Sequence, residues 1–367
     1  MLVLALLLSL GAAASAAYGP SAGCGAAPFC GGFCPPGVTA TQTFESGGVA
    51  RTYRLRLPLG YDPAAAQPQP LLLLFHGYGD DATGLEQQTQ FSPLADAQGF
   101  TVVYVNAVSM AEDPCVPPGS GGQAACRSQP TIGFNAGGAS SSPGPAGETC
   151  APATKGMCAS SCAARPQACN HCDWSTCLDD VAFVRSLLET QLLSGLCVDT
   201  ARVYAGGFSN GAILAYVLAA KMPEVFAAVA PLSATPHAGF MNPPLAGHSG
   251  VAVLDVHGDD DRVCPANATA GETYAIADDG WRYTTVLQAI DATWAEADGC
   301  AGGLAVAAIE IPANLDGVQC MEYKGCSVGN SSVMRCSFGG GHEVRSWWAQ
   351  LAWSFLSAHA KAQSKDE

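Results

Sequence analysis

Basic residues are scarce in this chain of 367 residues, where 16 lysines and arginines stand against 31 aspartates and glutamates and the formal net charge is −15. The few basic residues form no block. Nucleic acids and anionic membrane surfaces attract proteins through clustered positive charge. We therefore expect neither a nucleic acid nor an acidic membrane surface as a partner.

Long hydrophobic runs are also missing after the first residues of the chain. The best later candidate for a membrane span begins after Ser209. It is interrupted by Lys221, Pro223 and Glu224, whereas a spanning helix needs about 20 mostly apolar residues. We expect no membrane span, and because no cofactor motif is present we expect no cofactor.

The chain begins with an apolar run that ends in small residues, and Ala14-Ser15-Ala16 fits the A-x-A cleavage pattern. Although no basic residue precedes the run, we expect residues 1–17 to be a secretory signal peptide and the protein to be extracellular. Two N-x-S/T sequons, at Asn267 and Asn330, are candidate glycosylation sites.

Cysteine is abundant, with 17 residues. At this density, thiols persist as disulfides only in an oxidising compartment, and the simplest count is eight disulfides and one free thiol. Cys169, His171, Cys172 and Cys177 could suggest zinc, but no second C-x-x-C pair stands at zinc-finger spacing, so we expect disulfides and no metal. Four C-terminal cysteines are expected to pair among themselves: Cys300, Cys320, Cys326 and Cys336.

Alternating strand and helix patterns predict an α/β fold with a mostly parallel central sheet and helices on both faces. A continuous apolar run at 71–75 is typical of a central strand that is buried on both faces. Other strand patterns cover residues 50–58, 101–105, the run before Ser209 and 251–256, and helical patterns cover 94–98, 179–189, the stretch after Ser209 and 346–360.

Periodicity disappears between about residues 111 and 177, where glycine, proline, serine and cysteine dominate. A connection of this length without regular structure is usually functional or held by disulfides. We interpret it as a cysteine-rich insertion in one catalytic domain over residues 45–360. Residues 18–44 form a cysteine-containing, disulfide-tethered segment too short for its own core, and residues 361–367 form a tail.

The pattern G-x-S-x-G occurs at Gly207, Ser209 and Gly211, where it lies between a strand-like run and a helical run. In a nucleophile elbow, a serine lies on a sharp turn between strand and helix, and the glycines allow the two backbones to approach. Ser209 is therefore the candidate nucleophile. The alternative is an ordinary serine at the start of a helix.

The strand at 71–75 runs into His76-Gly77-Tyr78-Gly79, and ligand sites of open α/β sheets lie beyond the carboxyl ends of the strands. We expect the backbone N–H groups of Tyr78 and Asn210, the residue after the nucleophile, to form an oxyanion hole. His76 is interpreted as a buried structural histidine that shapes this loop.

A serine nucleophile needs an imidazole to take its proton and a carboxylate to orient that imidazole. Asp261 follows the strand at 251–256, and His342 lies on a glycine-rich loop before the last helix. The order of serine, aspartate and histidine is that of α/β-hydrolases. Asp259 and Asp260 compete with Asp261 on position alone. The other candidates are less suitable by position. His171 falls in the cysteine-rich loop, His237 and His248 in a Pro/Gly-rich segment, and His359 on the last helix. His257 lies beside the acid, and Asp255 lies inside its strand.

These motifs together resemble the secreted esterase family of polyhydroxybutyrate depolymerases and feruloyl esterases, which has the α/β-hydrolase fold. The matching pieces follow in the family's order across about residues 45–355: Arg51-Thr-Tyr-Arg to Pro58 with Tyr61-Asp62, Leu72-Leu-Leu-Phe-His-Gly, Asp179-Asp-Val-Ala-Phe-Val, Arg202-Val-Tyr-Ala-Gly-Gly-Phe-Ser-Asn-Gly, His257-Gly-x-x-Asp261 and Gly339-Gly-Gly-His342. The chain departs from the family in having Glu343 and Val344 after the histidine, where Trp-Pro is frequent, and in the length of its insertion.

The resemblance implies a serine carboxylesterase with Ser209, Asp261 and His342 as its triad. We expect a monomer that hydrolyses feruloyl or acetyl esters on or from an extracellular polysaccharide, with a polyhydroxybutyrate-type polyester as the alternative substrate. Two alternatives belong to other classes of protein. One is an inactive hydrolase fold used for binding, and the other is a cysteine-rich structural protein whose functional region would be the insertion.

Overall fold

The computed structural model describes most of the chain: residues 18–28, 34–64, 67–109, 111–114, 133–145, 147–163, 169–238, 240, 250–307, 317–328 and 331–362. The expected signal peptide at residues 1–17, the sequon at Asn330 and residues 115–132 of the expected insertion lie outside the described residues.

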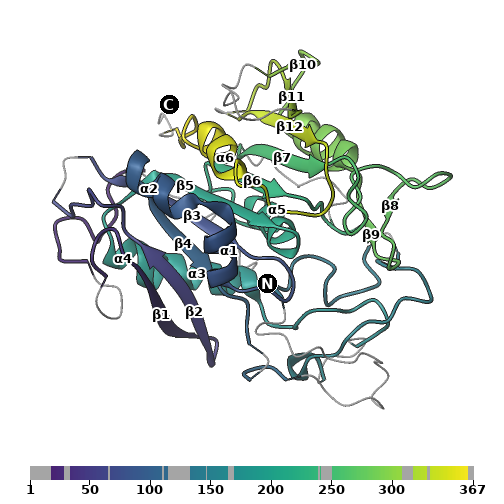
Figure 1. The fold of residues 1–367 in the computed structure, drawn as a ribbon, viewed down its shortest axis with the longest axis horizontal. Helices are drawn as coiled ribbons and strands as arrows, with labels where there is room; N and C mark the ends of the chain where they lie inside the picture. Colours follow the sequence, from purple (N-terminus) through teal and green to yellow (C-terminus); the bar gives the residue numbers. More distant parts are fainter. Residues whose placement is uncertain are drawn as a thin grey trace, which may run out of the picture.

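A ten-stranded sheet runs through the described part of the molecule (Figure 1). Its strands in chain order are β1 (Thr39–Ser46), β2 (Val49–Arg56), β3 (Gln69–Phe75), β4 (Thr101–Val105), β5 (Val198–Phe208), β6 (Ala228–Leu232), β7 (Ala252–Gly258), β10 (Leu304–Val306), β11 (Gln319–Tyr323) and β12 (Val333–Phe338). A separate short pair consists of β8 (Ala275–Ile276) and β9 (Arg282–Tyr283).

The strands lie in the order β1-β2-β4-β3-β5-β6-β7-β12-β11-β10. From β4 to β12 every neighbouring pair is parallel. Antiparallel strands flank this centre, with β1 and β2 at one edge and β11 and β10 at the other. The sheet is therefore mostly parallel, which confirms the prediction from the alternating pattern.

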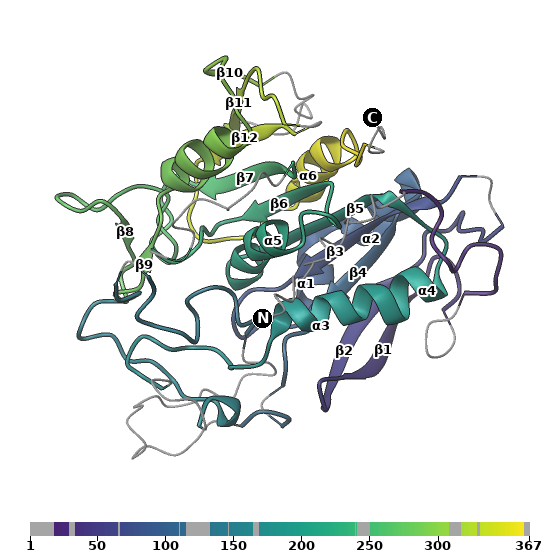
Figure 2. The same ribbon diagram turned by 180° about the vertical axis from the view of Figure 1, so that it is seen from behind.

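Helices cover both faces of the sheet, as predicted. One face carries α1 (Ala82–Thr89), α2 (Phe91–Gln98) and α6 (Trp348–Leu356), which lie in front in Figure 1. The opposite face, turned to the viewer in Figure 2, carries α3 (Asp180–Leu187), its π-helical continuation η2 (Leu188–Leu192), α4 (Leu193–Gly195), α5 (Asn210–Lys221) and the π-helix η3 (Leu287–Ala295).

Each face has its own hydrophobic core, and β3 contributes to both. Leu71, Leu73 and Phe75 belong to the cluster under α3, α5 and η3, whereas Leu72 and Leu74 belong to the cluster under α1, α2 and α6. Side chains alternate between the faces of a strand, so a strand buried on both sides must be apolar throughout. The run at 71–75 has this pattern, and the prediction of a central strand is confirmed.

The N-terminal segment is tied to the domain by a disulfide between Cys24 and Cys197, just before β5. A backbone bridge between Pro20 and Asp199 adds to this connection. The first strand already begins at Thr39 and pairs along its whole length with β2, so the sheet starts within the residues that the sequence assigns to the segment. No helix among the described residues is both long and apolar enough to cross a membrane.

Three disulfides hold the described part of the insertion. Cys150 pairs with Cys172, Cys158 with Cys169, and Cys162 with Cys177. The ligand atoms of Cys150, His171 and Cys172 lie within 4.8 Å of one another, but the two sulfurs are bonded to each other and so offer no thiolate. The expectation of disulfides at these cysteines is confirmed.

The four C-terminal cysteines pair among themselves, as predicted, in the bonds Cys300–Cys326 and Cys320–Cys336. The second bond joins β11 to β12, whose end leads into the loop that carries His342. Among the described residues, Cys264 is the free cysteine, and it is buried.

Candidate active site

Ser209 lies on a sharp turn between β5 and α5. Its backbone has φ 56° and ψ −119°, a region that residues with a side chain rarely adopt. A Cβ at Gly207 would come within 2.3 Å of the Gly211 carbonyl oxygen, and one at Gly211 within 2.1 Å of the Phe75 carbonyl oxygen. The two glycines are thus required for strand and helix to approach, as the G-x-S-x-G pattern predicts.

The structure brings together the three side chains that the sequence singles out. The Ser209 hydroxyl lies 2.8 Å from Nε2 of His342, and Nδ1 of His342 lies 2.8 Å from Oδ2 of Asp261. Because a carboxylate only accepts, Nδ1–H donates to Asp261, which leaves Nε2 to accept the serine proton. Ser209 and Asp261 are buried, so this line of hydrogen bonds is largely shielded from water.

Backbone contacts hold the acid and base loops against each other. The N–H of Asp259 donates to the Phe338 carbonyl over 2.9 Å, and the N–H of Asp260 donates to the Gly340 carbonyl over 2.9 Å. A Cβ at Gly258 would come within 2.5 Å of the Gly341 carbonyl oxygen. The glycines in both loops thus permit the close approach that puts Asp261 beside His342.

The competing aspartates differ from Asp261 in exposure and in partners. Asp259 and Asp260 are exposed. Asp255 is buried within β7 and accepts the hydroxyl proton of Tyr216 over 2.6 Å. Oδ1 of Asp261 accepts from the backbone N–H groups of Val263 and Cys264, at 2.9 and 2.8 Å. These bonds fix the carboxylate and leave Oδ2 for His342.

The expected oxyanion loop lies directly against the nucleophile. A Cβ at Gly77 would be 3.3 Å from Cβ of Ser209 and 3.1 Å from Cδ1 of Phe208. Tyr78 and Asn210 line the same cavity as Ser209. Asn210 begins α5, where backbone N–H groups have no partner within the helix. Both residues that the sequence predicts for the oxyanion hole thus lie at the cavity that holds the nucleophile.

His76 is fully buried behind this loop. Its Nδ1 donates to the Gly77 carbonyl over 2.7 Å, and its Nε2 accepts from the N–H of Ala107 over 3.0 Å. Burial lowers the pKa of this histidine, although the hydrogen bond to Gly77 and nearby carboxylates act in the other direction. Its neutral ring joins two loops, which agrees with the structural role predicted for this histidine.

A cavity of about 700 Å³ opens beside Ser209 and His342. One wall comes from the insertion, through residues 154–157 and Trp174, and another from Asp279, Trp281 and Tyr283 around β9. Aromatic rings from both walls contact one another: Trp174 meets Tyr78 edge-on at a centroid distance of 5.4 Å and Trp281 at 6.1 Å. The insertion thus shapes the space in which a substrate would lie.

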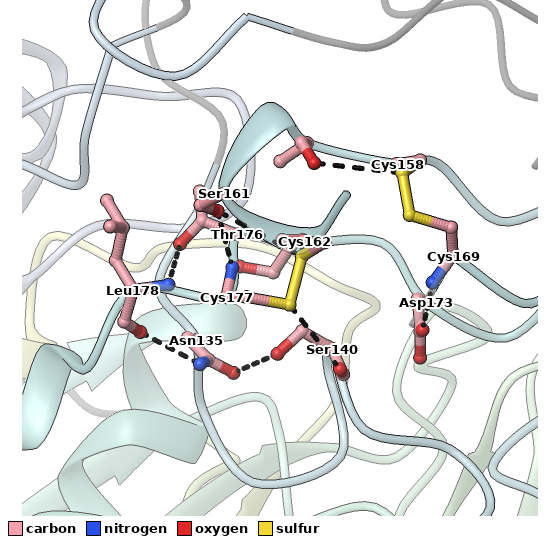
Figure 3. The surroundings of a disulfide bond; sticks show 12 residues. Asn135, Ser140, Cys158, Ser161, Cys162, Cys169, Asp173, Thr176, Cys177 and Leu178 are labelled. Carbon is pink, nitrogen blue, oxygen red and sulfur yellow. Dashed lines mark hydrogen bonds between the residues drawn. A yellow bond between two sulfur atoms is a disulfide. The ribbon is translucent and has the colours of Figure 1, made fainter. Parts of the chain in front are cut away.

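Disulfides and hydrogen bonds hold the insertion wall in place. Figure 3 shows the Cys158–Cys169 and Cys162–Cys177 bonds side by side, with Cys169 N–H donating to Asp173. The two stretches of the insertion that line the cavity are residues 154–157 and Trp174. Both lie close in sequence to these two disulfides, the first just before Cys158 and the second three residues before Cys177. No periodic pattern in the sequence indicates such a wall.

Sequence reasoning missed two side chains that support this arrangement. The amide group of Asn210 accepts from Phe134 N–H over 2.6 Å and donates to the Phe134 carbonyl over 3.0 Å, which joins the elbow to the insertion. The ring of His237 accepts a hydrogen bond from the indole N–H of Trp174 and packs against that indole. A lone histidine in a Pro/Gly-rich segment carries no signal for this contact. His248 lies outside the described residues.

The strand order, the sharp turn after β5 and the chain order of serine, aspartate and histidine define an α/β-hydrolase fold. No family model matches the chain.

The chain is similar to "Probable feruloyl esterase C" of Aspergillus clavatus, with 37% identity over 93 residues, or 25% of this chain and 32% of that protein. It is also similar to "Putative esterase NocK" of Nocardia uniformis subsp. tsuyamanensis, with 28% identity over 230 residues, or 62% of this chain and 50% of that protein. The matches span half or less of these relatives. Among solved structures, an acetyl xylan esterase from Aspergillus awamori aligns with a TM-score of 0.48 and 14% identity over 86% of this chain and 99% of that one. The resemblance to esterases that the motifs indicate is thus confirmed at the level of sequence.

Proposed function

We propose that the protein is a secreted serine carboxylesterase that hydrolyses ester bonds on or from extracellular polymers, with feruloyl or acetyl esters of polysaccharide as substrates. Ser209 is the nucleophile, His342 the general base and Asp261 the residue that orients His342. The observation that carries the proposal is the line of 2.8 Å hydrogen bonds from Ser209 through His342 to Asp261 at the wall of a large cavity.

In the first half of the reaction, the Ser209 oxygen attacks the ester carbonyl while its proton passes to Nε2 of His342. Asp261 stabilises the imidazolium that forms. The carbonyl oxygen becomes an oxyanion, and the N–H groups of Tyr78 and Asn210 are suited to bind it. When the bond to the alcohol oxygen breaks, His342 returns the proton to that oxygen, and the alcohol leaves.

In the second half, a water molecule attacks the acyl group on Ser209, and His342 takes a proton from this water. The tetrahedral intermediate then breaks the bond to Ser209, whose oxygen recovers a proton from His342. The acid product leaves, and the side chains are back in their starting protonation states. Every proton moves between side chains of this chain, substrate and water.

The shape and chemistry of the cavity support an ester of a polymer-derived sugar. Its walls combine the rings of Trp174 and Trp281, suited to a flat acyl group, with polar groups such as Asp80 and Lys155, suited to hydroxyl groups. The similarity to a feruloyl esterase favours the same class of acyl group. A polyhydroxybutyrate-type polyester remains the second candidate, since the resemblance of the motifs covers both classes.

Disulfides support an extracellular site of action. Six disulfides join twelve cysteines of the described residues, and bonds at this density are typical of exported proteins. Asn267 is exposed and available for a glycan.

A panel of esters tests the proposal: p-nitrophenyl acetate, p-nitrophenyl butyrate, methyl ferulate, acetylated xylan and a hydroxybutyrate oligomer. We expect kcat/KM to be higher for methyl ferulate or acetylated xylan than for the oligomer, and Ser209→Ala to lose activity on every ester. The reverse ranking would favour the polyester. A wild-type protein that neither cleaves the panel nor reacts with a fluorophosphonate at Ser209 would instead be a binding protein.

A further inference from the structure

A second histidine lies behind the acid of the Ser209–His342–Asp261 group. His257 is in β7, only 2% exposed, with Nε2 3.8 Å from Oδ2 of Asp261, the oxygen that faces His342. It is not one of the described residues that line the cavity. The member of the Ser209–His342–Asp261 group that His257 faces is Asp261.

Both ring nitrogens of His257 face groups that accept hydrogen bonds. Nε2 lies 2.7 Å from the Cys264 carbonyl oxygen, and because a carbonyl only accepts, Nε2 carries a proton. Nδ1 lies 3.5 Å from Oδ1 of Asp255, and within the described chain neither atom has a hydrogen-bond partner. A neutral ring would turn a lone pair toward a buried carboxylate, which is unfavourable. A second proton, on Nδ1, removes this conflict.

The elements around Asp255 supply no other charge to balance it. Its Oδ2 accepts from the hydroxyl of Tyr216 on α5, and burial beside this carboxylate raises the pKa of that hydroxyl, so it stays neutral. Arg335 on the neighbouring strand β12 is in register with Asp255. The ion pairs of the described residues do not include one between them. Among the described residues, the ion-pair partner of Asp255 is His257.

The ion-pair partners of Asp261 among the described residues are the two histidines, His257 and His342. Burial raises the pKa of the Cys264 thiol and of the Tyr283 hydroxyl, so both remain protonated near neutral pH. Burial lowers the pKa of His257, but the nearby Asp255 carboxylate, the hydrogen bond to the Cys264 carbonyl and the charge of Asp261 together outweigh it and raise this pKa. The electrostatic balance agrees with the geometry.

We propose that His257 is a positioning residue, which stands as an imidazolium between Asp255 and Asp261 and keeps the Asp261 carboxylate ionised and aligned on His342. The inference rests on the proposed function, because it takes Asp261 as the acid of the triad. A buried carboxylate needs a compensating charge. The same charge makes His342 less basic, since an imidazolium nearby disfavours a second one.

The first test is the pH profile of His257→Gln. We expect kcat to fall about tenfold with KM unchanged, and the acid limb of kcat/KM to move up by about one pH unit, because His342 becomes more basic once the nearby charge is gone. His359→Gln is the matched control, since His359 is a partly buried histidine bound to the Phe355 carbonyl at the end of α6. It should leave the profile unchanged. A loss of stability in His257→Gln with an unmoved acid limb would overturn the proposal.

A second test does not depend on activity. In protein with ¹⁵N-labelled histidine, the ring of His257, assigned by comparison with His257→Gln, should carry protons on both nitrogens at pH 7. Asp255→Asn should allow Nδ1 to lose its proton at a lower pH than in the wild type. A neutral ring in the wild type would refute the inference even if Ser209→Ala abolishes ester hydrolysis. An imidazolium in a protein that cleaves no ester would leave the charge arrangement standing and remove the proposed function.

Discussion

The indole N–H of Trp174 donates a hydrogen bond to Nε2 of His237 over 3.2 Å. His237 in turn donates from Nδ1 to the Arg282 carbonyl over 3.1 Å, and its ring stacks on Tyr283 at 4.8 Å between centroids. A buried neutral histidine thus connects the insertion to the segment around β9. Because Trp174 and Tyr283 both line the cavity, this histidine fixes the relative position of two of its walls.

Trp174→Ala should change substrate preference more than reactivity. We expect kcat/KM for methyl ferulate to fall about tenfold, since stacking and burial of an aromatic acyl group on an indole are worth about 1.4 kcal/mol. The value for p-nitrophenyl acetate should stay within about twofold, because a small acyl group does not reach the ring. Steady-state kinetics on the two esters measure this. Equal losses on both would show that Trp174 acts on the triad rather than on the acyl group.

The stability of the protein should fall in mild acid because of His237. Burial lowers its pKa from 6.5 to about 4, so between these values the unfolded chain binds a proton that the folded chain does not. Unfolding therefore becomes easier as the pH falls from 6.5 to 4, by up to about 3 kcal/mol. Urea unfolding at pH 7 and pH 4.5 measures the loss. His237→Gln should reduce this pH dependence, and an unchanged dependence would contradict the assignment to His237.

The sequence predicts the sheet and the elbow well because both follow from local patterns. The apolar run at 71–75 is typical of a strand buried on two faces, and the glycines around Ser209 are required by backbone contacts of 2.1 and 2.3 Å. The cavity walls follow from no such pattern. Trp174 reaches the site through disulfides and a contact with His237, 63 residues away in sequence, and His257 differs from other buried histidines only by its tertiary neighbours.

The choice of acid can be tested against its exposed neighbours. Asp261→Asn should lower kcat by about 10⁴ because His342 loses the partner that sets its tautomer. Asp259→Asn and Asp260→Asn remove the same charge from the same loop, but both side chains are exposed, and we expect activity within about twofold of the wild type. Rates with p-nitrophenyl butyrate, together with circular dichroism as a check on folding, decide the matter. Strong loss in either neighbour with activity retained in Asp261→Asn would identify a different acid.

The oxyanion loop is tested by a single methyl group. Gly77→Ala places a Cβ 3.1 Å from Phe208 and 3.3 Å from Ser209, so the loop must move by a few tenths of an ångström and carry Tyr78 with it. We expect kcat to fall about tenfold or more, since the loss of one oxyanion donor costs about 10²–10³. Gly60→Ala is the control, because no atom lies within 4 Å of an added Cβ there. Wild-type kcat in Gly77→Ala would exclude Tyr78 N–H from the oxyanion hole.

Two disulfides that close loops of similar length should differ in their effect on activity. Cys162–Cys177 separates its cysteines by 15 residues and Cys300–Cys326 by 26, and the entropy of closing either loop predicts about 3 kcal/mol of stabilisation. Replacing either pair by alanines should therefore lower the free energy of unfolding by similar amounts. Only the first pair fixes the insertion wall, because Trp174 lies three residues before Cys177 and Met157 five residues before Cys162.

We expect the Cys162→Ala, Cys177→Ala protein to show a higher KM for methyl ferulate, and the Cys300→Ala, Cys326→Ala protein to keep the wild-type KM. Kinetics well below the unfolding temperature of both variants separate the two effects. If both variants lose stability but keep the same KM, the wall holds its shape without the disulfide, and the insertion does not need this bond to form the cavity.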